Sequence, residues 1–178
     1  MTKKVAELSA LIMQEHSLKH MEFIAEILQQ KPDIIPQLLL IVYKEEHPIS
    51  NRAAWPLRKL FDKKPALLEP YYDEIIAALP TIKSSSILRT LLSIICRTTI
   101  DEKWHAFFLQ YTSELIINNS TEIAVKAGAM DIFFQIAKKH RELFAELEQM
   151  MAYIYPDASR GIQNKCRNFT KSIQKLSV

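Results

Sequence analysis

Hydrophobic residues recur at helical spacing along the chain, and the pattern is clearest on the two sides of the turn at Lys64-Pro65. Before the turn, one apolar stripe consists of Ala53, Leu57, Leu60 and Phe61. After the turn, a second stripe consists of Leu68, Tyr72, Ile75, Ile76 and Leu79. One such helical hairpin cannot bury both of its apolar stripes alone, so the pattern predicts further hairpins of the same kind along the chain.

Similar stripes, separated by prolines and polar turns, continue in both directions. They predict helices over residues 3–15, 17–31, 33–46, 48–64, 65–80, 81–100, 101–119, 120–140, 141–156 and 157–178. Ser17 is placed to cap the second of these helices, because a serine hydroxyl accepts a hydrogen bond from the first helical turn. No segment alternates like a β-strand over a useful length, so the sequence predicts an all-α fold.

The helical hairpins repeat at a roughly constant interval. Lys31-Pro32 matches Lys64-Pro65 at an offset of 33 residues. Phe61 then matches Ile95 at an offset of 34, and Ala137 follows 42 residues later. A period in this range is typical of helical-hairpin solenoids.

Composition narrows the class of protein. Two glycines in 178 residues argue against dinucleotide-binding and phosphate-loop folds, which need several glycines with positive φ. Cys96 and Cys166 lie far apart beside apolar stripes, which favours buried, reduced thiols over a disulfide or a metal site. No apolar run is long enough for a membrane span, and the first residues predict a helix rather than a signal peptide. The sequence therefore predicts a single reduced, cytoplasmic domain over residues 1–178.

Two stretches resemble the HEAT-repeat family. Residues 43–54 (YKEEHPISNRAA) resemble its acidic-proline turn and the Val-Arg-x-x-Ala run of its second helix. Residues 124–129 (AVKAGA) resemble that run with Lys126 in place of the arginine, and Pro36 and Pro70 suit the family's first helices. The resemblance covers residues 32–176. It implies a right-handed α–α superhelix of about four HEAT-like hairpins plus an N-terminal helix pair, and it implies no chemistry.

Charge is divided unequally between the two helices of each predicted hairpin. The second helices line the concave face in such a superhelix, and we call them the inner set: residues 17–31, 48–64, 81–100, 120–140 and 157–178. The inner set holds eighteen Lys and Arg against six Asp and Glu, whereas the remaining helices after residue 31 hold three against twelve. Two interpretations stay open. The division complements the helix dipoles and keeps the chain in solution, or it forms a basic groove that attracts an acidic partner.

An overlay of the inner set predicts which residues face the groove. The predicted concave binding face consists of Glu22, Trp55, Arg58, Lys59, Arg89, Asp131, Phe134, Asn164 and Arg167. Trp55 stands nearly opposite the buried stripe of its helix, and an exposed tryptophan beside arginine suits ligand recognition. The alternative is that Trp55 packs against a neighbouring inner helix or the N-terminal segment. A slip of one residue in the overlay would put Met130 in the place of Asp131.

The sequence offers little support for a metal site or a catalytic site. His16 and His20 have the spacing of two metal ligands on one helix, but Ser17 starts a new helix between them and no third ligand is evident. No catalytic grouping and no phosphate loop can be proposed from the spacing of the other residues. The sequence therefore predicts no enzyme activity, no cofactor and no metal.

Three functions remain compatible with these residues. The first is a noncatalytic scaffold that binds an acidic protein or peptide through the basic face. The second is nucleic-acid binding, with basic side chains on phosphates and Trp55 stacked on a base. The third is an enzyme similar to the alkylpurine DNA glycosylases built on HEAT-like repeats, whose composition Trp55, Arg89 and Asp131 imitate. The sequence favours the scaffold, predicts no membrane partner and leaves the oligomeric state open.

Overall fold

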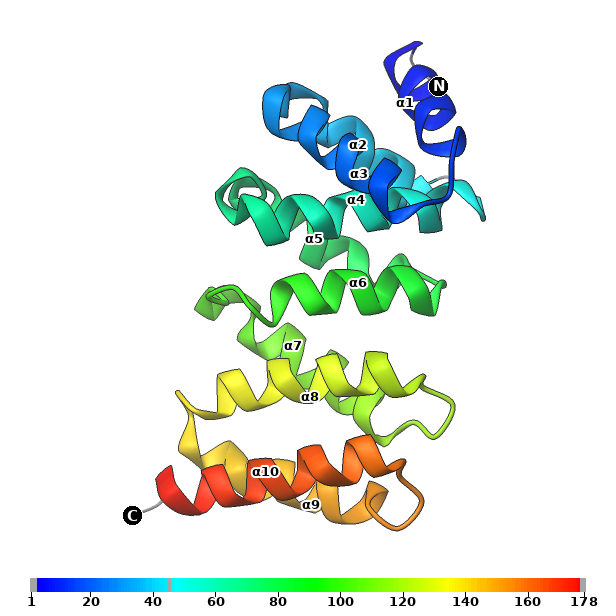
Figure 1. Ribbon diagram of the computed structural model, residues 1–178. Coiled ribbons are helices and arrows are strands. Elements are labelled where there is room, and N and C mark those ends of the chain that lie inside the picture. Colours follow the sequence, from blue (N-terminus) through cyan, green and yellow to red (C-terminus); the bar gives the residue numbers. More distant parts are fainter. Residues whose placement is uncertain (1–2, 45, 177–178) are drawn as a thin grey trace. The chain divides into compact units, whose positions relative to one another are not determined.

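The computed structural model describes residues 3–44 and 46–176, and every regular element in these ranges is a helix (Figure 1). The α-helices are α1 Lys3–Met13, α2 Leu18–Gln30, α3 Ile35–Lys44, α4 Ile49–Lys63, α5 Tyr72–Ala78, α6 Ser85–Ile95, α7 His105–Ile117, α8 Ile123–Ala137, α9 Phe144–Ile154 and α10 Arg160–Leu176. Short 3₁₀ turns lie between them: η1 Pro32–Ile34, η2 Pro65–Leu67, η3 Glu69–Tyr71, η4 Leu79–Thr81, η5 Glu102–Trp104 and η6 Arg141–Leu143. The predicted all-α fold of helical hairpins is confirmed.

The chain folds into two compact units, one ending at Ile94 and the other beginning at Ile95, which we call the N-terminal unit and the C-terminal unit. In the N-terminal unit, α4 packs against α1, α2 and α3. In the C-terminal unit, α7 packs against α8 and α9, and α10 packs against α8 and α9. Within each unit the helices therefore contact both their hairpin partner and the equivalent helix of the next hairpin.

Two turns show why the sequence repeat becomes a structural repeat. Lys31 and Lys64 both end an inner helix and precede a proline, with φ/ψ of −133°/71° and −145°/69°. A proline disfavours the helical region for the residue before it, so each helix must end there. The amide groups of Lys31 and Lys64 donate hydrogen bonds to the carbonyls of Ile27 and Leu60, four residues earlier in each case. The same dipeptide thus gives the same turn 33 residues apart.

The segment 65–80 differs from the single amphipathic helix predicted for it. It forms η2, η3, the short helix α5 and η4. Pro70 and Pro80 explain the difference, because neither has an N–H to donate into a continuous α-helix. The apolar positions are nevertheless placed as predicted, since Leu68, Ile75 and Leu79 are fully buried.

The predicted cap of α2 is present. The backbone N–H of His20 donates to Ser17 Oγ at 3.1 Å, and Ser17 has extended φ/ψ, as a cap residue should. Asp101 makes the equivalent contact before α7, where its carboxylate accepts from the N–H of Lys103. Polar side chains that accept hydrogen bonds from the first turn thus fix where these helical segments begin.

The buried faces follow the predicted stripes. Ala53, Leu57, Leu60 and Phe61 of α4 are all buried, so the opposite side of α4 is available for other contacts. In the C-terminal unit a core cluster forms around Phe133 and Met130, both with no exposed surface. Because the buried stripe of α4 is the predicted one, the residues predicted to face away from it lie on the accessible side of this helix.

The prediction for the two cysteines was right for one residue only. Neither cysteine forms a disulfide, and Cys166 is buried, as expected from the apolar stripe of α10. Cys96 is only half-buried, because it follows the last residue of α6 and lies in the turn that leaves the helix.

Candidate binding pocket in the N-terminal unit

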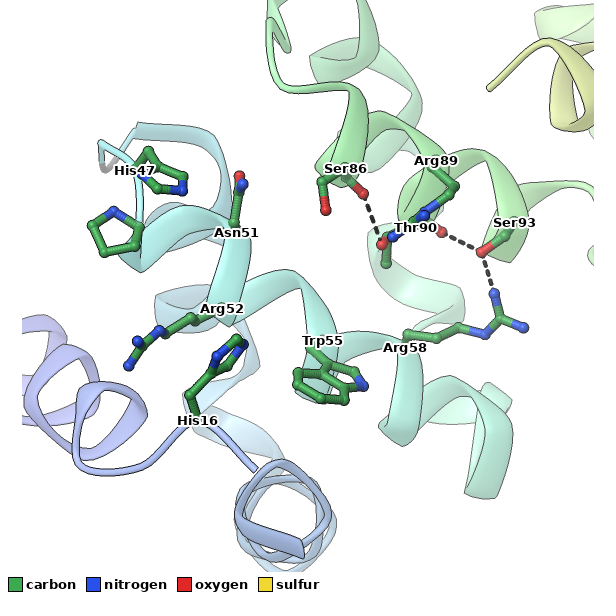
Figure 2. Close-up of a pocket in the computed structure, with 11 residues that line it drawn as sticks. His16, His47, Asn51, Arg52, Trp55, Arg58, Ser86, Arg89, Thr90 and Ser93 are labelled. Atoms are coloured by element: carbon green, nitrogen blue, oxygen red, sulfur yellow. Dashed lines mark hydrogen bonds between the residues drawn. The ribbon is translucent and has the colours of Figure 1, made fainter. Parts of the chain in front are cut away.

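A depression with a volume of about 850 Å³ lies between α4 and α6 (Figure 2). Most of its residues are polar, aromatic or basic, and they come from both helices, the turn before α4 and the loop before α2: His16, His47, Pro48, Asn51, Arg52, Trp55, Arg58, Ser86, Arg89, Thr90 and Ser93. Three of the predicted face residues, Trp55, Arg58 and Arg89, are therefore brought together around one pocket. We call it the α4–α6 pocket.

The α4–α6 pocket is strongly basic. Arg52, Arg58 and Arg89 contribute three guanidinium groups, and none of the described lining residues is an aspartate or glutamate. Arg89 is exposed, whereas Arg52 and Arg58 are half-buried. A concave surface lined by one sign of charge concentrates the electric field, so this pocket should attract anions.

Arg58 is held in place by two partners. Its Nε donates to both carboxylate oxygens of Asp62, at 3.1 and 3.3 Å, one turn further along α4. Its Nη1 donates to Ser93 Oγ on α6. This side chain therefore joins the two walls of the pocket, and Asp62 partly neutralises its charge.

Arg52 and Arg89 are placed differently. Within the part of the chain that the structure describes, neither guanidinium makes an ion pair or a hydrogen bond. Figure 2 shows Arg52 on α4 and Arg89 on α6, so the two uncommitted cations come from different walls of the pocket. Each retains the fork of N–H donors that binds a carboxylate or phosphate through two hydrogen bonds.

Trp55 is half-buried and contributes an aromatic surface to the pocket. The His16 ring meets it edge-on, with 5.6 Å between ring centroids. This contact matches part of the alternative set out above, because His16 belongs to the N-terminal segment. The indole nevertheless lines the pocket, so packing against His16 and access to a ligand coexist.

The polar groups of the pocket wall are mostly ordered by α6. Thr90 donates to the carbonyl of Ser86 at 3.0 Å, and Ser93 donates to the carbonyl of Thr90 at 2.7 Å. On the α4 side, Asn51 Oδ1 accepts from Ser84 at 2.8 Å, which leaves the amide nitrogen of Asn51 as a donor. These contacts fix the wall and keep Asn51 oriented for donation.

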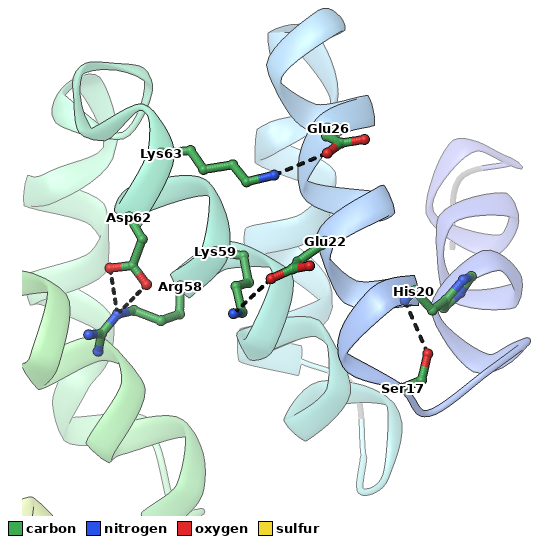
Figure 3. A network of polar contacts seen from close by, with 8 residues as sticks. All are labelled: Ser17, His20, Glu22, Glu26, Arg58, Lys59, Asp62 and Lys63. Atoms are coloured by element: carbon green, nitrogen blue, oxygen red, sulfur yellow. Dashed lines mark hydrogen bonds and ion pairs between the residues drawn. The ribbon is translucent and has the colours of Figure 1, made fainter.

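Two more predicted face residues, Glu22 and Lys59, lie outside the pocket lining and form an ion pair of 3.2 Å (Figure 3). A second pair, Lys63 with Glu26 at 3.1 Å, joins the same two helices, α2 and α4. Both pairs are partly exposed and should contribute little to stability. Their main effect is to neutralise the lysines that would extend the basic surface along α4.

The other predicted face residues belong to the C-terminal unit. Asp131 of α8 pairs with Lys165 of α10, and Phe134 stacks on Phe169 with 4.4 Å between centroids. Met130 is fully buried and Asp131 is not, so the overlay did not slip by one residue at this helix.

Asn164 and Arg167 are both exposed on α10. Arg167 donates to Asn164 Oδ1 and to Tyr155 Oη, the latter at 2.7 Å. Arg167 also lines a depression between α9 and α10, and Glu148 and Tyr155 are among its other lining residues. In this unit α8 residues Asp131 and Phe134 thus contact the next inner helix, α10, whereas Arg167 contacts Asn164 and Tyr155.

Sequence reasoning did not select several residues that line the α4–α6 pocket. Arg52 precedes Trp55 by three residues on α4, and Ser93 follows Arg89 by four on α6, so helical spacing could have identified both. His16 and His47 lie outside α-helices, and no local pattern indicates that they line this pocket.

Among the described residues, no group of three or more His, Cys, Asp and Glu is arranged to hold a metal ion. His20 is engaged instead with the carbonyl of Leu11, at 2.8 Å from Nε2. None of the helices in the described ranges combines the length and apolar character that crossing a bilayer requires.

The helical hairpins of both units and the period that relates them define an α-helical repeat protein. The chain belongs to the HEAT-repeat family: a family model described as a HEAT repeat domain matches residues 8–173. The predicted resemblance is therefore confirmed over nearly the whole chain. HEAT repeats generally mediate protein–protein interactions, and the family is typically noncatalytic. Comparison with curated proteins and with solved structures gave no significant match.

Proposed function

We propose that this chain is a noncatalytic interaction protein whose N-terminal unit binds an acidic segment of a partner protein. The observation that carries the proposal is the α4–α6 pocket, which has three arginines and no described carboxylate in its lining. The family supports a role in protein binding, and the charge of the pocket supports an acidic partner.

The ion pairs support the interpretation that the unequal charge of the inner set serves to bind an acidic partner. Four of the six acidic residues of the inner set pair with basic residues of the same set, namely Glu22, Glu26, Asp62 and Asp131. The inner set holds eighteen basic residues, so most of its positive charge is left over after these pairs form. A surplus of one sign on the inner helices of the N-terminal unit favours fast association with a partner of the opposite sign.

Nucleic acid is the other partner considered from the sequence. A nucleic-acid surface usually offers a stripe of cations along which several phosphates bind. Next to the pocket, however, Lys59 and Lys63 are paired with acids of α2, so the stripe is interrupted along α4. The uncommitted arginines are concentrated in one pocket, which suits a local acidic segment better than a long polyanion.

The proposal can be tested by fluorescence polarisation with two labelled pools of random peptides. One pool is rich in Asp and Glu, and the other has Asn and Gln at the same positions. We expect the acidic pool to bind more tightly, and its affinity to fall as salt is raised, because ions screen the pocket charges. The double variant Arg52→Gln/Arg89→Gln should weaken binding by about tenfold or more.

The matched control is Lys19→Gln/Lys31→Gln, which removes the same charge from exposed positions of the N-terminal unit outside the pocket. This control should bind nearly as well as the parent chain. Equal binding of the two pools, or equal losses in the two double variants, would contradict the proposal. Tighter binding of single-stranded DNA than of the acidic pool, with the same dependence on Arg52 and Arg89, would instead favour the nucleic-acid function.

A further inference from the structure

We infer that the exposed face of α10 binds the phosphate backbone of double-stranded nucleic acid. This surface belongs to the C-terminal unit and shares no residue with the α4–α6 pocket, so the inference goes beyond the proposed function. It is carried by the charge of α10, a helix of 17 residues that contains five basic residues and no acidic residue.

The exposed residues of α10 form one polar surface. Ile162, Cys166 and Ile173 belong to the core of the C-terminal unit, where α10 packs against α8 and α9 (Figure 1). Eight other residues are exposed, and we call them the α10 face: Arg160, Gly161, Asn164, Arg167, Asn168, Lys171, Gln174 and Lys175. Its four cations follow one another at intervals of seven, four and four residues. Such intervals place them on one side of the helix, in a row about 22 Å long.

The cations of the α10 face keep their charge. Three of them make no side-chain hydrogen bond or ion pair within the described ranges: Arg160, Lys171 and Lys175. The fourth, Arg167, donates only to neutral groups, Asn164 Oδ1 and Tyr155 Oη. The remaining basic residue of α10, Lys165, is paired with Asp131 and does not belong to the face. Four positive charges are therefore available to an outside anion.

One acidic residue lies beside this row. Glu148 of α9 lines the same depression as Arg167 and Lys171. In the part of the chain that the structure describes, Glu148 forms no ion pair, so it does not neutralise either cation by direct contact. It should nevertheless weaken the binding of an anion at this place, which gives the inference a test of opposite sign.

A row of like charges matches a polyanion with regularly spaced phosphates. Each strand of a duplex carries one phosphate per about 3.4 Å of the helix axis, so a row about 22 Å long can meet several of them. Amide side chains also bind phosphate oxygens, and the α10 face adds three of these between its cations: Asn164, Asn168 and Gln174. Contacts of this kind hold a duplex without selecting its sequence.

The composition of the α10 face argues against a protein or a membrane as its partner. Protein interfaces depend on aromatic and aliphatic anchors and are depleted of lysine at their centre. A helix that lies in a membrane surface must insert an apolar side into the lipid. None of the eight residues of the α10 face is aliphatic or aromatic, and the apolar side of α10 is buried in its own unit.

A single strand fits less well than a duplex. Proteins that bind single strands stack the bases on accessible aromatic rings. The aromatic residue of α10, Phe169, is already engaged, because it stacks on Phe134 with 4.4 Å between centroids and has Lys165 Nζ 5.2 Å from its ring centroid. The α10 face therefore offers contacts to a phosphate backbone and no platform for bases.

The test measures fluorescence polarisation of two labelled DNA duplexes of equal length and unrelated sequence. We expect both duplexes to bind alike. With four phosphates neutralised, affinity should fall about a hundredfold between about 50 and 200 mM salt. Arg167→Gln/Lys171→Gln leaves two cations, so its affinity should be lower and should fall only about tenfold over the same range. Glu148→Gln should bind more tightly than the parent chain.

The matched control is Lys139→Gln/Arg141→Gln, which removes one lysine and one arginine from exposed positions of the same unit outside α10. It should keep the salt dependence of the parent chain, and circular dichroism verifies that each variant is folded. Arg52→Gln/Arg89→Gln should also keep this salt dependence, so the duplex assay is independent of the acidic-peptide assay.

Three results would overturn the inference. The first is equal salt dependence in Arg167→Gln/Lys171→Gln and in the control, or loss of duplex binding only in Arg52→Gln/Arg89→Gln. The second is tighter binding of a single strand of the same length through Arg167 and Lys171, which would make the assignment to a duplex wrong. The third is tighter binding of the acidic peptide pool, or of phosphatidylserine vesicles, through these same two residues. None of these results would contradict peptide binding at the α4–α6 pocket.

Discussion

Replacing Phe133 by alanine is the most direct test of how α8 is oriented. Phe133 has no exposed surface and lies in the core cluster of the C-terminal unit with Met130, Phe144 and Leu147. Burying a phenylalanine side chain is worth about 1.5–3 kcal/mol, and the cavity left by its removal adds a further cost. Phe133→Ala should therefore lower the free energy of unfolding by about 3–5 kcal/mol.

Phe134, the next residue, provides a matched control. It is only half-buried and stacks on Phe169 of α10, with 4.4 Å between ring centroids. Phe134→Ala removes this aromatic contact and part of the apolar contact with the core, but it opens little enclosed space. We expect a loss of about 1–2 kcal/mol. The same substitution at two adjacent residues thus separates the buried face of α8 from its partly exposed side.

Urea unfolding followed by tryptophan fluorescence can measure both losses. The chain has two tryptophans, Trp55 in the N-terminal unit and Trp104 in the C-terminal unit, so each unit has its own probe. In a Trp55→Phe background, Trp104 reports the unit that contains Phe133. If the chain is the single domain predicted from the sequence, Trp55 and Trp104 should report the same midpoint.

The outcome that refutes this reasoning is simple to recognise. Equal losses for Phe133→Ala and Phe134→Ala, or a larger loss for Phe134→Ala, would mean that α8 is rotated from the orientation described. The assignment of Asp131 to the same side of α8 as Phe134 would then also be wrong.

Three further predictions follow from the ionisable groups. Burial, with a smaller contribution from Glu114, raises the pKa of Tyr111 to about 12. Since the unfolded chain loses this proton near pH 10, stability should fall between about pH 10 and 12, and Tyr111→Phe should reduce that fall in thermal melts. Burial lowers the pKa of Lys126, so charging it opposes folding. Lys126→Met should therefore not lower the melting temperature at neutral pH. In the parent chain, the folded state loses the Lys126 proton at a lower pH than the unfolded state, so stability should rise with pH below about 10.5, and Lys126→Met should abolish this rise. Burial raises the pKa of the Cys166 thiol, so it should react more slowly than half-buried Cys96 with a thiol reagent, and faster labelling of Cys166 would contradict this.

Much of the fold could be predicted from local pattern. The turns at Lys31-Pro32 and Lys64-Pro65, the cap at Ser17 and the buried stripe of α4 all follow from residues within one or two helical turns of each other. Local chemistry determines these features, because a proline ends a helix and a serine caps one wherever the rest of the chain lies. The segment 65–80 was the exception, since its two additional prolines divide the predicted helix into 3₁₀ turns around α5.

The candidate site could be predicted only in part. Helical spacing placed Trp55, Arg58 and Arg89 on the side opposite the buried stripes, and these residues do line one pocket. Spacing could not show that Lys59 would reach Glu22 on α2, or that Arg58 would reach Ser93 on α6. These partnerships depend on the distance and rotation between helices, which the sequence period does not specify.

The sequence by itself determined that the chain is built from helical hairpins, which face of each helix is apolar, and that the second helices carry the positive charge. Each of these properties depends only on residues that lie close together in the sequence. The tertiary structure decided which of those charges remain uncommitted. Lys59 and Lys63 were neutralised and Arg52 and Arg89 were not, although all four lie on the same helix or the next inner helix. The reason is that an ion pair requires contact within about 4 Å, and only helix packing brings residues more than thirty positions apart to that distance.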